Sequence, residues 1–267
     1  MQDRYTGDLG DFSKLGILRA LQAAGLSIGV NWYLTPDESH NGDGRHVKYL
    51  RQEEFKACDK VLWQELKNIV DSNHRKVCYL ENGNILPACF YSERLDFSGK
   101  VKAERESFRK EWHKKALAAL IGNSIVCLDP DNGLIVPSAV GKSKENKYVL
   151  HDELADYYAQ QSSVIYYQHK ARKTDQFYIR QHEEMIHSQR FPHAKCRQPS
   201  ETAINDTIPG HVKTLFPVSD RRPYGQRNSV KSICITLLRK PQSDKPQGSG
   251  DWSPEKINMG YETTLSE

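Results

Sequence analysis

Apolar and polar residues follow a regular spacing along the chain up to about residue 190. Apolar positions three or four residues apart predict amphipathic helices, and short continuous apolar runs predict buried strands. On this basis we expect Asp11 to cap the N-terminus of a first helix and Gly25 to end that helix. Further helices are expected over residues 53–70, 102–121, 151–160 and 174–188, and strands over 28–34, 77–80, 124–128 and 163–167.

Strands that alternate with helices in this way predict an α/β fold, with a mostly parallel sheet and helices on both of its faces. In open sheets of this kind, ligands bind in a crevice beyond the carboxyl ends of the strands. The sequence therefore predicts a site formed by residues 35–44, 129–134 and 168–172.

The regular pattern ends near residue 190, where prolines become frequent. One apolar run remains, over 232–238, and the segment after it is rich in Pro, Gln, Ser, Gly and charged residues, which is typical of disorder. We therefore expect an α/β domain over 1–190, an irregular region or small subdomain over 191–239, and a disordered tail over 240–267.

Hydrophobic residues make up 37% of the chain and charged residues 27%, so the chain is more polar than most compact domains. The formal net charge of +4 permits contact with nucleic acid without implying it. The six cysteines form no closely spaced pair of the kind that binds metal or exchanges electrons. Cys78 and Cys127 lie in apolar runs and are expected to be small buried side chains, which fits a reducing compartment.

The sequence also bears on the cellular compartment. Its first residues lack the apolar core of a signal peptide, and no run reaches the roughly 18 apolar residues that a membrane span requires. We therefore expect a cytoplasmic protein without membrane contact. The oligomeric state leaves no signal in the sequence.

The segment Asp129-Pro130-Asp131-Asn132-Gly133 directly follows a strongly apolar predicted strand. A carboxylate is costly to bury at the end of such a strand, and there it can bind an amino group, a metal ion or a ribose hydroxyl. The alternative is a strand-to-loop turn in which the Asp129 side chain caps backbone amides. Asp37 follows the first predicted strand in the same way, which favours a shared site.

The segment Asp129-Pro130-Asp131-Asn132 resembles the Asp-Pro-Pro-Tyr motif of the adenine-N6 methyltransferases. Over roughly residues 3–170, the order of features is also similar to that of the ribosomal RNA adenine-N6 methyltransferases of the RlmJ type. Residues 7–14 stand where that family has an Ala-Gly-Asn segment and a helix with a Lys, and residues 41–45 stand where it has a glycine-rich loop. The opening Asp-Arg-Tyr-Thr-Gly-Asp is similar to that of a set of uncharacterised bacterial proteins.

The resemblance implies a Rossmann-like, methyltransferase-type sheet, S-adenosylmethionine as the cofactor, and adenine in RNA or DNA as the substrate. The catalytic residues that it implies are Asp129, Pro130 and Asn132, and the cofactor-binding residues are Asp37, Gly42, Gly44 and Lys14. The motif departs from the family in two places. Asp131 stands where the family has its second Pro, and Asn132 where it has the Tyr that stacks on the base.

Two other functions are compatible with the same residues. The loop after the first predicted strand is dense in carboxylate and imidazole groups, which can bind a divalent metal ion: Asp37, Glu38, His40, Asp43 and His46. Together with Asp129 and Asp131 they would form the acidic site of a metal-dependent nuclease or phosphoesterase. The same loop can equally be a solvated polar turn. The other function is that of a non-catalytic methyltransferase-like protein, for example in phage defence.

Three further groups of residues have both a structural and a functional interpretation. Asp8, Asp11 and Lys14 can share the start of the first helix, where carboxylates are favourable. The Lys and Arg residues of 100–115 are expected to form a solvated helix face rather than a phosphate-binding surface, because glutamates interrupt them. His169 can act as an acid or base at the crevice or be structural.

Overall fold

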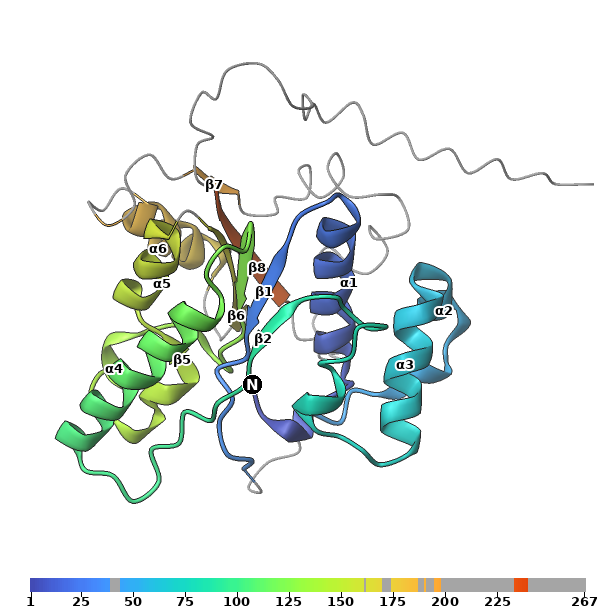
Figure 1. Ribbon diagram of the computed structural model, residues 1–267, viewed down its shortest axis with the longest axis horizontal. Helices are drawn as coiled ribbons and strands as arrows, with labels where there is room; N and C mark the ends of the chain where they lie inside the picture. Colours follow the sequence, from blue (N-terminus) through green and yellow to red (C-terminus); the bar gives the residue numbers. More distant parts are fainter. Residues whose placement is uncertain are drawn as a thin grey trace, which may run out of the picture.

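The structure is a computed structural model that describes residues 1–38, 44–160, 162–169, 174–186, 190, 195–197 and 233–239. A six-stranded sheet lies at its centre, with the strand order β2-β1-β3-β6-β8-β7 (Figure 1). The strands β2, β1, β3 and β6 are parallel, and β8 is antiparallel to both of its neighbours, β6 and β7. The strands are β1 (Ile28–Asn31), β2 (Cys89–Tyr91), β3 (Ile125–Leu128), β6 (Ser163–His169), β7 (Lys195–Arg197) and β8 (Ile233–Arg239).

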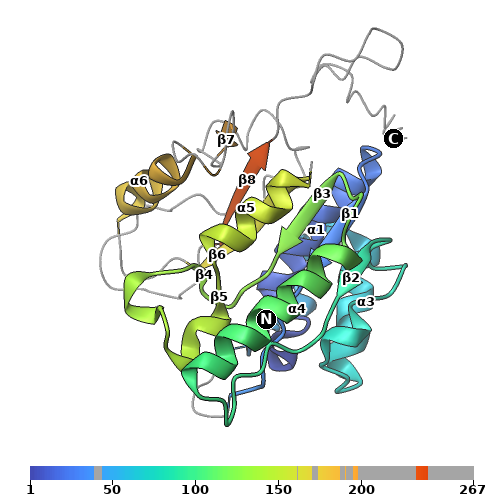
Figure 2. The ribbon, with the colours of Figure 1, turned by 60° about the vertical axis from the view of Figure 1, so that its left-hand side comes forward.

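Helices cover both faces of this sheet (Figure 1). One face carries α1 (Leu9–Ala23), α2 (Glu53–Cys58) and α3 (Lys60–Asp71). The other face carries α4 (Lys102–Ala119), α5 (His151–Ala159) and α6 (Asp175–Ile186), and Figure 2 shows α4 and α5 side by side in front of the sheet. The expected α/β fold with a parallel sheet is thus confirmed for the four strands β2, β1, β3 and β6.

Short elements connect the layers. They are the 3-10 helices η1 (Asp3–Tyr5), η2 (Lys48–Arg51), η3 (Val77–Tyr79), η4 (Pro137–Ala139) and η5 (Ser143–Lys147), and the parallel pair β4 (Gly133–Leu134) and β5 (Tyr148–Val149). Within the described parts of the chain, no helix combines the length and the apolar composition that crossing a membrane requires.

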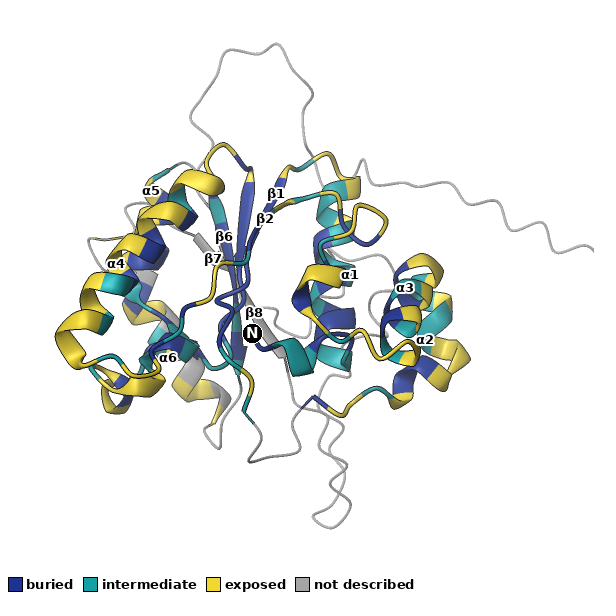
Figure 3. Cartoon of the chain, turned by 60° about the horizontal axis from the view of Figure 1, so that its bottom comes forward, coloured by how far each residue is buried: buried dark blue, intermediate teal, exposed yellow. Residues whose placement is uncertain are grey.

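The core forms two layers because side chains alternate along each strand. In β3, Ile125 and Cys127 pack with α1 and α3, whereas Val126 and Leu128 pack with α4 and α5. All four residues of β3 are buried, as expected for a parallel strand covered on both faces. Figure 3 shows this arrangement, with buried residues along the strands and exposed residues on the outer sides of the helices.

The first helix begins earlier than its sequence predicts. Asp8 is the N-cap of α1, and its side chain accepts a hydrogen bond from the Asp11 backbone N–H at 3.1 Å. The prediction that Asp11 is the cap is wrong, because the Asp11 side chain turns back and accepts a hydrogen bond from the Gly7 N–H at 2.9 Å. Gly25 follows the C-cap, Ala24, with a φ of +85°, a conformation that glycine adopts at low cost.

The helix expected over 53–70 is two helices, because the chain becomes extended at Asp59 (φ −153°). The Asp59 carboxylate accepts a hydrogen bond from the Leu62 N–H at 2.9 Å and starts α3. It also binds Arg19 of α1, with 2.7 Å between Nε and Oδ2. The break therefore turns α3 so that it packs against α1.

The strand expected over 77–80 is wrong, since this segment forms η3. The Val77 N–H donates to the Asp3 carboxylate at 2.9 Å instead of joining the sheet. Val77 and Leu80 are fully buried, whereas Cys78, which we expected to be buried, is exposed. The outer strand next to β1 is β2 instead, a segment for which the sequence pattern predicts no strand.

Of the apolar run expected over 232–238, residues 233–238 lie in β8, which pairs with β6 and so belongs to the central sheet. The expected disordered tail, 240–267, lies outside the described residues. The boundaries that we expect between the regions 1–190 and 191–239 stay a prediction.

An ion pair between Arg109 and Glu153 joins α4 to α5 within the core. The guanidinium Nε and Nη2 atoms lie 2.6 and 2.7 Å from the two carboxylate oxygens, and both side chains are 5% exposed. Burial raises the pKa of Glu153, but the Arg109 charge more than offsets this and holds the pKa below its usual value. Arg109 therefore does not belong to the solvated basic face that we expected over 100–115.

The Arg109–Glu153 pair generates a stability prediction. Replacing Glu153 with Gln leaves the Arg109 guanidinium buried without a counter-charge, which should lower the free energy of unfolding by about 3–5 kcal/mol. Urea denaturation followed by circular dichroism measures this change. Asp152→Asn is the control: it removes an exposed pair with Arg190 and should leave the unfolding midpoint unchanged. Equal midpoints for Glu153→Gln and the wild type would contradict the prediction.

Candidate ligand site at the ends of β1 and β3

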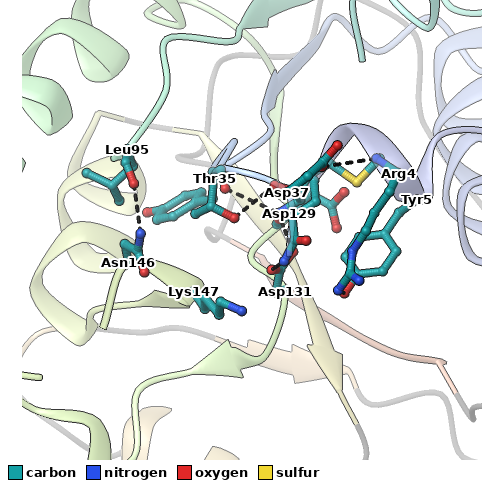
Figure 4. Close-up of polar contacts among 12 residues, drawn as sticks. Arg4, Tyr5, Thr35, Asp37, Leu95, Asp129, Asp131, Asn146 and Lys147 are labelled. Carbon is teal, nitrogen blue, oxygen red and sulfur yellow. Dashed lines mark hydrogen bonds and ion pairs between the residues drawn. The ribbon is translucent and has the colours of Figure 1, made fainter. Parts of the chain in front are cut away.

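The order of the strands reverses beside β1. The chain passes from β1 outward to β2 and then returns to form β3 on the other side of β1. The two connections therefore leave the adjacent ends of β1 and β3 in opposite directions and open a crevice there, the usual place for a ligand in such a sheet. Asp37 and Asp129 both lie at this edge (Figure 4).

Lys14 of α1 reaches this edge and binds Asp129. Its Nζ atom lies 2.6 Å from Asp129 Oδ2 and 3.0 Å from Asp11 Oδ1. The side chains of Asp129 and Asp11 are 3% and 1% exposed, so neither charge is solvated by water to any extent. Two buried carboxylates thus share one cation. Lys14 and Asp129 are 115 residues apart in the sequence.

The cluster holds more negative than positive charge. Burial raises the pKa of Asp11 to about 7; Asp8 and Asp129 add to this rise, and Lys14 opposes it. Burial also raises the pKa of Asp8. Although burial lowers the pKa of Lys14, the facing carboxylates raise it well above the usual value, so Lys14 is charged at neutral pH.

Tyr167 of β6 closes the cluster on one side. The Lys14 Nζ atom lies 5.4 Å from the centre of the Tyr167 ring, within the range of a cation–π contact. A cavity of about 10 Å³ lies beside it and is lined by Lys14, Ile17, Leu18, Cys127, Ile165 and Tyr167. Such a volume holds one water molecule at most, so this cavity is no ligand pocket.

The first two residues fill the space between the strand ends. The ammonium group of Met1 donates to the backbone oxygens of Tyr33 and Asp129, at 3.2 and 3.0 Å, and lies 2.8 Å from Asp131 Oδ1. The Gln2 side-chain amide donates to Asp131 Oδ2 at 2.7 Å. Burial raises the pKa of Asp131, but the ammonium of Met1 and the amide of Gln2 lower it below its usual value.

The backbone of Tyr33 has a φ of +46°, a left-handed conformation that is costly for a residue with a bulky side chain. The Asn31 side chain supports it, because its Oδ1 atom accepts a hydrogen bond from the Tyr33 N–H at 3.1 Å. The Nδ2 atom of Asn31 in turn donates to the Tyr157 hydroxyl at 3.0 Å. This turn ends β1 at Asn31, three residues before the predicted end at Leu34.

The loop after β1 is held by ion pairs with the N-terminal segment. The Asp37 carboxylate accepts a hydrogen bond from the Arg4 N–H at 3.2 Å, and the Glu38 carboxylate pairs with Arg4 and with Lys147. Figure 4 shows Arg4, Asp37 and Lys147 around the edge that carries Asp129 and Asp131. The Asp37 side chain itself is exposed.

The loop after β3 forms hydrogen bonds with Lys147 and with Gln168. The Asn132 N–H donates to the Lys147 carbonyl at 2.9 Å, and the buried Gln168 side chain accepts from the Leu134 N–H and donates to the Asn132 carbonyl. Gly133 has a φ of +93°, and a Cβ atom there would lie 2.5 Å from Gln168 Oε1. Glycine is therefore required at this turn, and Pro130 before it is buried.

The structure brings together two of the residues predicted for the site, Lys14 and Asp129, in direct contact. Gly44 packs against the N-terminal segment, since a Cβ atom on it would lie 2.4 Å from the Arg4 carbonyl oxygen. His46 is exposed. Gly42, like His40 and Asp43, lies outside the described residues.

The described residues contain no group of three His, Cys, Asp or Glu side chains arranged to hold a metal ion. Asp129 and Asp131, which a metal site would use, are instead paired with the ammonium groups of Lys14 and Met1. Along α4, Lys102 and Lys115 are exposed and pair with glutamates, which agrees with a solvated helix face.

Sequence reasoning missed Met1, Gln2 and Tyr33. No local pattern shows that the first two residues fill the sheet edge. Because we predicted a strand over 28–34, we did not predict the left-handed turn at Tyr33. For Gln168 there was a signal, since a polar residue inside an apolar strand suggests a specific hydrogen bond.

Comparisons of the chain with protein-family models, with curated proteins and with solved structures each find no match. The functional argument therefore rests on the geometry of this edge and on the sequence motifs.

Because Lys14 pairs with Asp129, we predict that substitutions of these two residues have non-additive effects on the free energy of unfolding. Lys14→Met leaves two buried carboxylates without a cation and should lower the free energy of unfolding by about 3–5 kcal/mol. Adding Asp129→Asn to this variant removes one of the uncompensated charges and should recover part of the loss. Urea denaturation of the two single variants and the double variant measures the coupling. Strictly additive effects would show that the two groups do not interact.

The raised pKa of Asp11 predicts a pH dependence of stability. A carboxyl group whose pKa is about 7 in the folded protein and 3.8 when unfolded stabilises the fold at low pH, and this contribution is lost as pH rises through 7. Asp11→Asn should therefore reduce the loss of unfolding free energy between about pH 4.5 and about pH 7.5.

Asp96→Asn is the control for the pH experiment. Hydrogen bonds from Ser98 lower the pKa of Asp96 below 3.8, so its contribution to stability is lost only as pH falls below that value, and Asp96→Asn should keep the wild-type slope between the two pH values. Urea titrations at the two pH values give both slopes. An Asp11→Asn protein with the pH slope of the wild type would contradict the assignment.

Proposed function

We propose that this protein is an S-adenosylmethionine-dependent methyltransferase that acts on adenine in a nucleic acid, with its cofactor site beyond β1 and β3. One observation carries the proposal. Asp129, the first residue of the Asp-Pro motif, lies at the edge where the strand order reverses, in contact with Lys14. Ligand sites in doubly wound sheets lie at this place.

The strand order supports a Rossmann-like sheet of the methyltransferase type. Both neighbours of β8 are antiparallel to it, so β8 is a reversed strand between two parallel ones near one edge of the sheet. Many doubly wound sheets carry a reversed strand near an edge.

The charge of the edge suits a cationic cofactor. Four carboxylates converge there, those of Asp8, Asp11, Asp129 and Asp131, and two ammonium groups face them. S-adenosylmethionine carries a sulfonium and an ammonium group and supplies an activated methyl group when it is bound. An excess of buried carboxylate favours such a ligand over an anionic one such as a nucleotide.

The residues of this chain can be given roles in that reaction. Asp129 would accept a hydrogen bond from the amino group of the target adenine, as the resembled motif implies, and Lys14 holds its carboxylate in place. Asp37, exposed at the neighbouring strand end, would accept hydrogen bonds from ribose hydroxyls. Asn132 offers an amide at the position of the Tyr in the family, so hydrogen bonding would replace stacking on the base.

A second candidate is a methyltransferase-like protein that binds without catalysis. The observation that favours it is the filling of the crevice by Met1 and Gln2, which are 2% and 0% exposed. The metal-dependent hydrolase has less support, since Asp129 and Asp131 are already paired with ammonium groups.

Calorimetric titration with S-adenosylmethionine tests the proposal. We expect binding to the wild type and a loss of about tenfold to a hundredfold in affinity for Asp37→Ala, because hydrogen bonds between a charged group and the ligand are removed. Asp96→Ala, another loop aspartate, should bind like the wild type. Transfer of a labelled methyl group to RNA or DNA should be seen for the wild type and lost in Asp129→Ala.

The outcomes separate the candidates. Binding without methyl transfer to any nucleic acid would favour the non-catalytic protein. Absence of binding at millimolar cofactor would refute the methyltransferase and leave the non-catalytic protein and the metal-dependent hydrolase.

A further inference from the structure

Two segments on the α1 side of the sheet form a surface with an excess of positive charge. The basic surface consists of residues 44–52 and 72–80, which together contain five Lys or Arg residues and no Asp or Glu. The net charge of the whole chain is only +4, so the positive charge is concentrated here. Arg75 joins the two segments, because its guanidinium donates to the Gly44 carbonyl at 2.6 Å and to the Thr6 carbonyl at 2.8 Å.

The cations of the basic surface are available to a partner. Arg45, Lys48 and Lys76 are exposed, and among the described residues no carboxylate pairs with them. Arg51 is also exposed and lies near the carboxylate of Asp71, which is itself paired with a lysine of α3. Exposed cations of this kind attract a polymer that carries regularly spaced negative charges.

An exposed aromatic pair belongs to the same surface. The rings of His74 and Tyr79 are stacked, with 4.9 Å between their centres and 8° between their planes. Tyr79 is 42% exposed, and His74 is exposed as well. An exposed ring beside several cations is the combination that binds an unpaired base and its phosphates, because every base has a face that can stack.

Hydrogen bonds of the backbone hold the aromatic pair in place. Asn73, which follows the C-cap of α3, has a φ of +57°, a left-handed conformation that Asn adopts more readily than most residues. The next N–H, that of His74, donates to the Ile69 carbonyl at 3.0 Å, and the Tyr79 N–H donates to the Lys76 carbonyl at 3.0 Å. The aromatic rings and Lys76 therefore belong to one folded turn.

The basic surface borders the crevice at the strand ends. The Val77 N–H donates to the Asp3 carboxylate at 2.9 Å, and the N–H of the next residue, Arg4, donates to the Asp37 carboxylate at 3.2 Å. Two residues of η1 thus connect the basic surface to Asp37. A chain bound on this surface lies next to the edge of the sheet that carries the candidate ligand site.

We propose that the basic surface binds a single-stranded nucleic acid, with phosphates on its exposed Lys and Arg side chains and one base stacked on Tyr79. A single strand is favoured over a duplex because a base that stacks on a side chain must be free of its pairing partner. An anionic membrane is disfavoured because it takes up several apolar side chains, whereas Tyr79 is the only exposed large apolar residue of these two described segments.

This inference deepens the proposed function and rests on it for the choice of nucleic acid as the partner. Binding at the basic surface itself requires no cofactor. It can therefore be measured with the full chain alone, and its failure is distinguishable from a failure to bind S-adenosylmethionine.

Fluorescence anisotropy of labelled, unstructured RNA and DNA oligonucleotides tests the stacking. Tyr79→Ala should weaken binding about fivefold to a hundredfold, the loss of one stacked base. Tyr79→Phe keeps the ring and should bind like the wild type. Phe177→Ala is the matched control, because Phe177 is also 42% exposed but lies on α6, on the other face of the sheet. Wild-type affinity in Tyr79→Ala would overturn the stacking on Tyr79.

The salt dependence of binding tests the phosphate contacts. Each phosphate that a side chain neutralises adds about 0.7 to the slope with which log affinity falls against log salt concentration. Lys48→Gln and Lys76→Gln should each reduce the slope by about this amount, and both variants should fold because the side chains are exposed. Lys114→Gln, exposed on α4 at the other face of the sheet, should keep the wild-type slope. Wild-type slopes in both test variants would overturn the proposal.

The outcomes separate this proposal from the proposed function. If the oligonucleotides bind but none of the test variants changes binding, the basic surface is wrong as a binding site and the proposed function stands. If the test variants weaken oligonucleotide binding while S-adenosylmethionine does not bind, the basic surface stands and the methyltransferase is refuted. If no oligonucleotide binds at low salt, the proposal is overturned whatever the cofactor does.

Vesicles of phosphatidylcholine and phosphatidylserine test the other anionic partner. We expect the wild type to stay in the supernatant when such vesicles are sedimented in a solution of moderate salt concentration. Sedimentation with the vesicles that is lost in Lys48→Gln and Lys76→Gln, without binding of the oligonucleotides, would assign the basic surface to a membrane and overturn the proposal.

Discussion

The ion pair between Lys14 and Asp129 is the constraint on which the ends of the central strands depend. Asp129 lies at the end of β3 with its side chain 3% exposed, and burial of such a charge is tolerated only beside a cation. Lys14 supplies that cation from the second turn of α1 and binds Asp11 as well. The start of α1, the position of the first residues and the path of the loop after β3 are thereby coupled through one charge cluster.

This coupling explains why the edge of the sheet is both polar and closed. Three carboxylates face Lys14, and a fourth, that of Asp131, faces the ammonium of Met1. On the side away from α1, Gln168 and Lys147 fix the loop after β3 by hydrogen bonds to its backbone. The edge thus has an excess of carboxylates, and its loop is held by several hydrogen bonds.

Much of the fold could be predicted from the spacing of apolar residues. The strands β1, β3 and β6 and the helices α1, α4, α5 and α6 lie where that spacing places them, within a few residues. Two of the errors share one cause. Val77 and Leu80 are buried at a spacing of three and read as a short strand, but the Val77 N–H binds Asp3 and the segment becomes η3. Asp59 divides a continuous amphipathic pattern because its carboxylate binds Arg19. In each case a side chain distant in sequence supplied the partner.

The sequence by itself determined the α/β class, the presence of carboxylates at two strand ends, and the candidate role of Lys14. The first two follow from local periodicity and from the order of residues along single strands, and the role of Lys14 is what the resemblance implies. Only the tertiary structure decided that Lys14 binds Asp129, that Met1 lies between β1 and β3, and that Tyr33 adopts a left-handed turn. The physical reason is that a buried charge must find its counter-charge wherever packing brings one, and the distance along the chain, 115 residues for Lys14 and Asp129, does not reveal it.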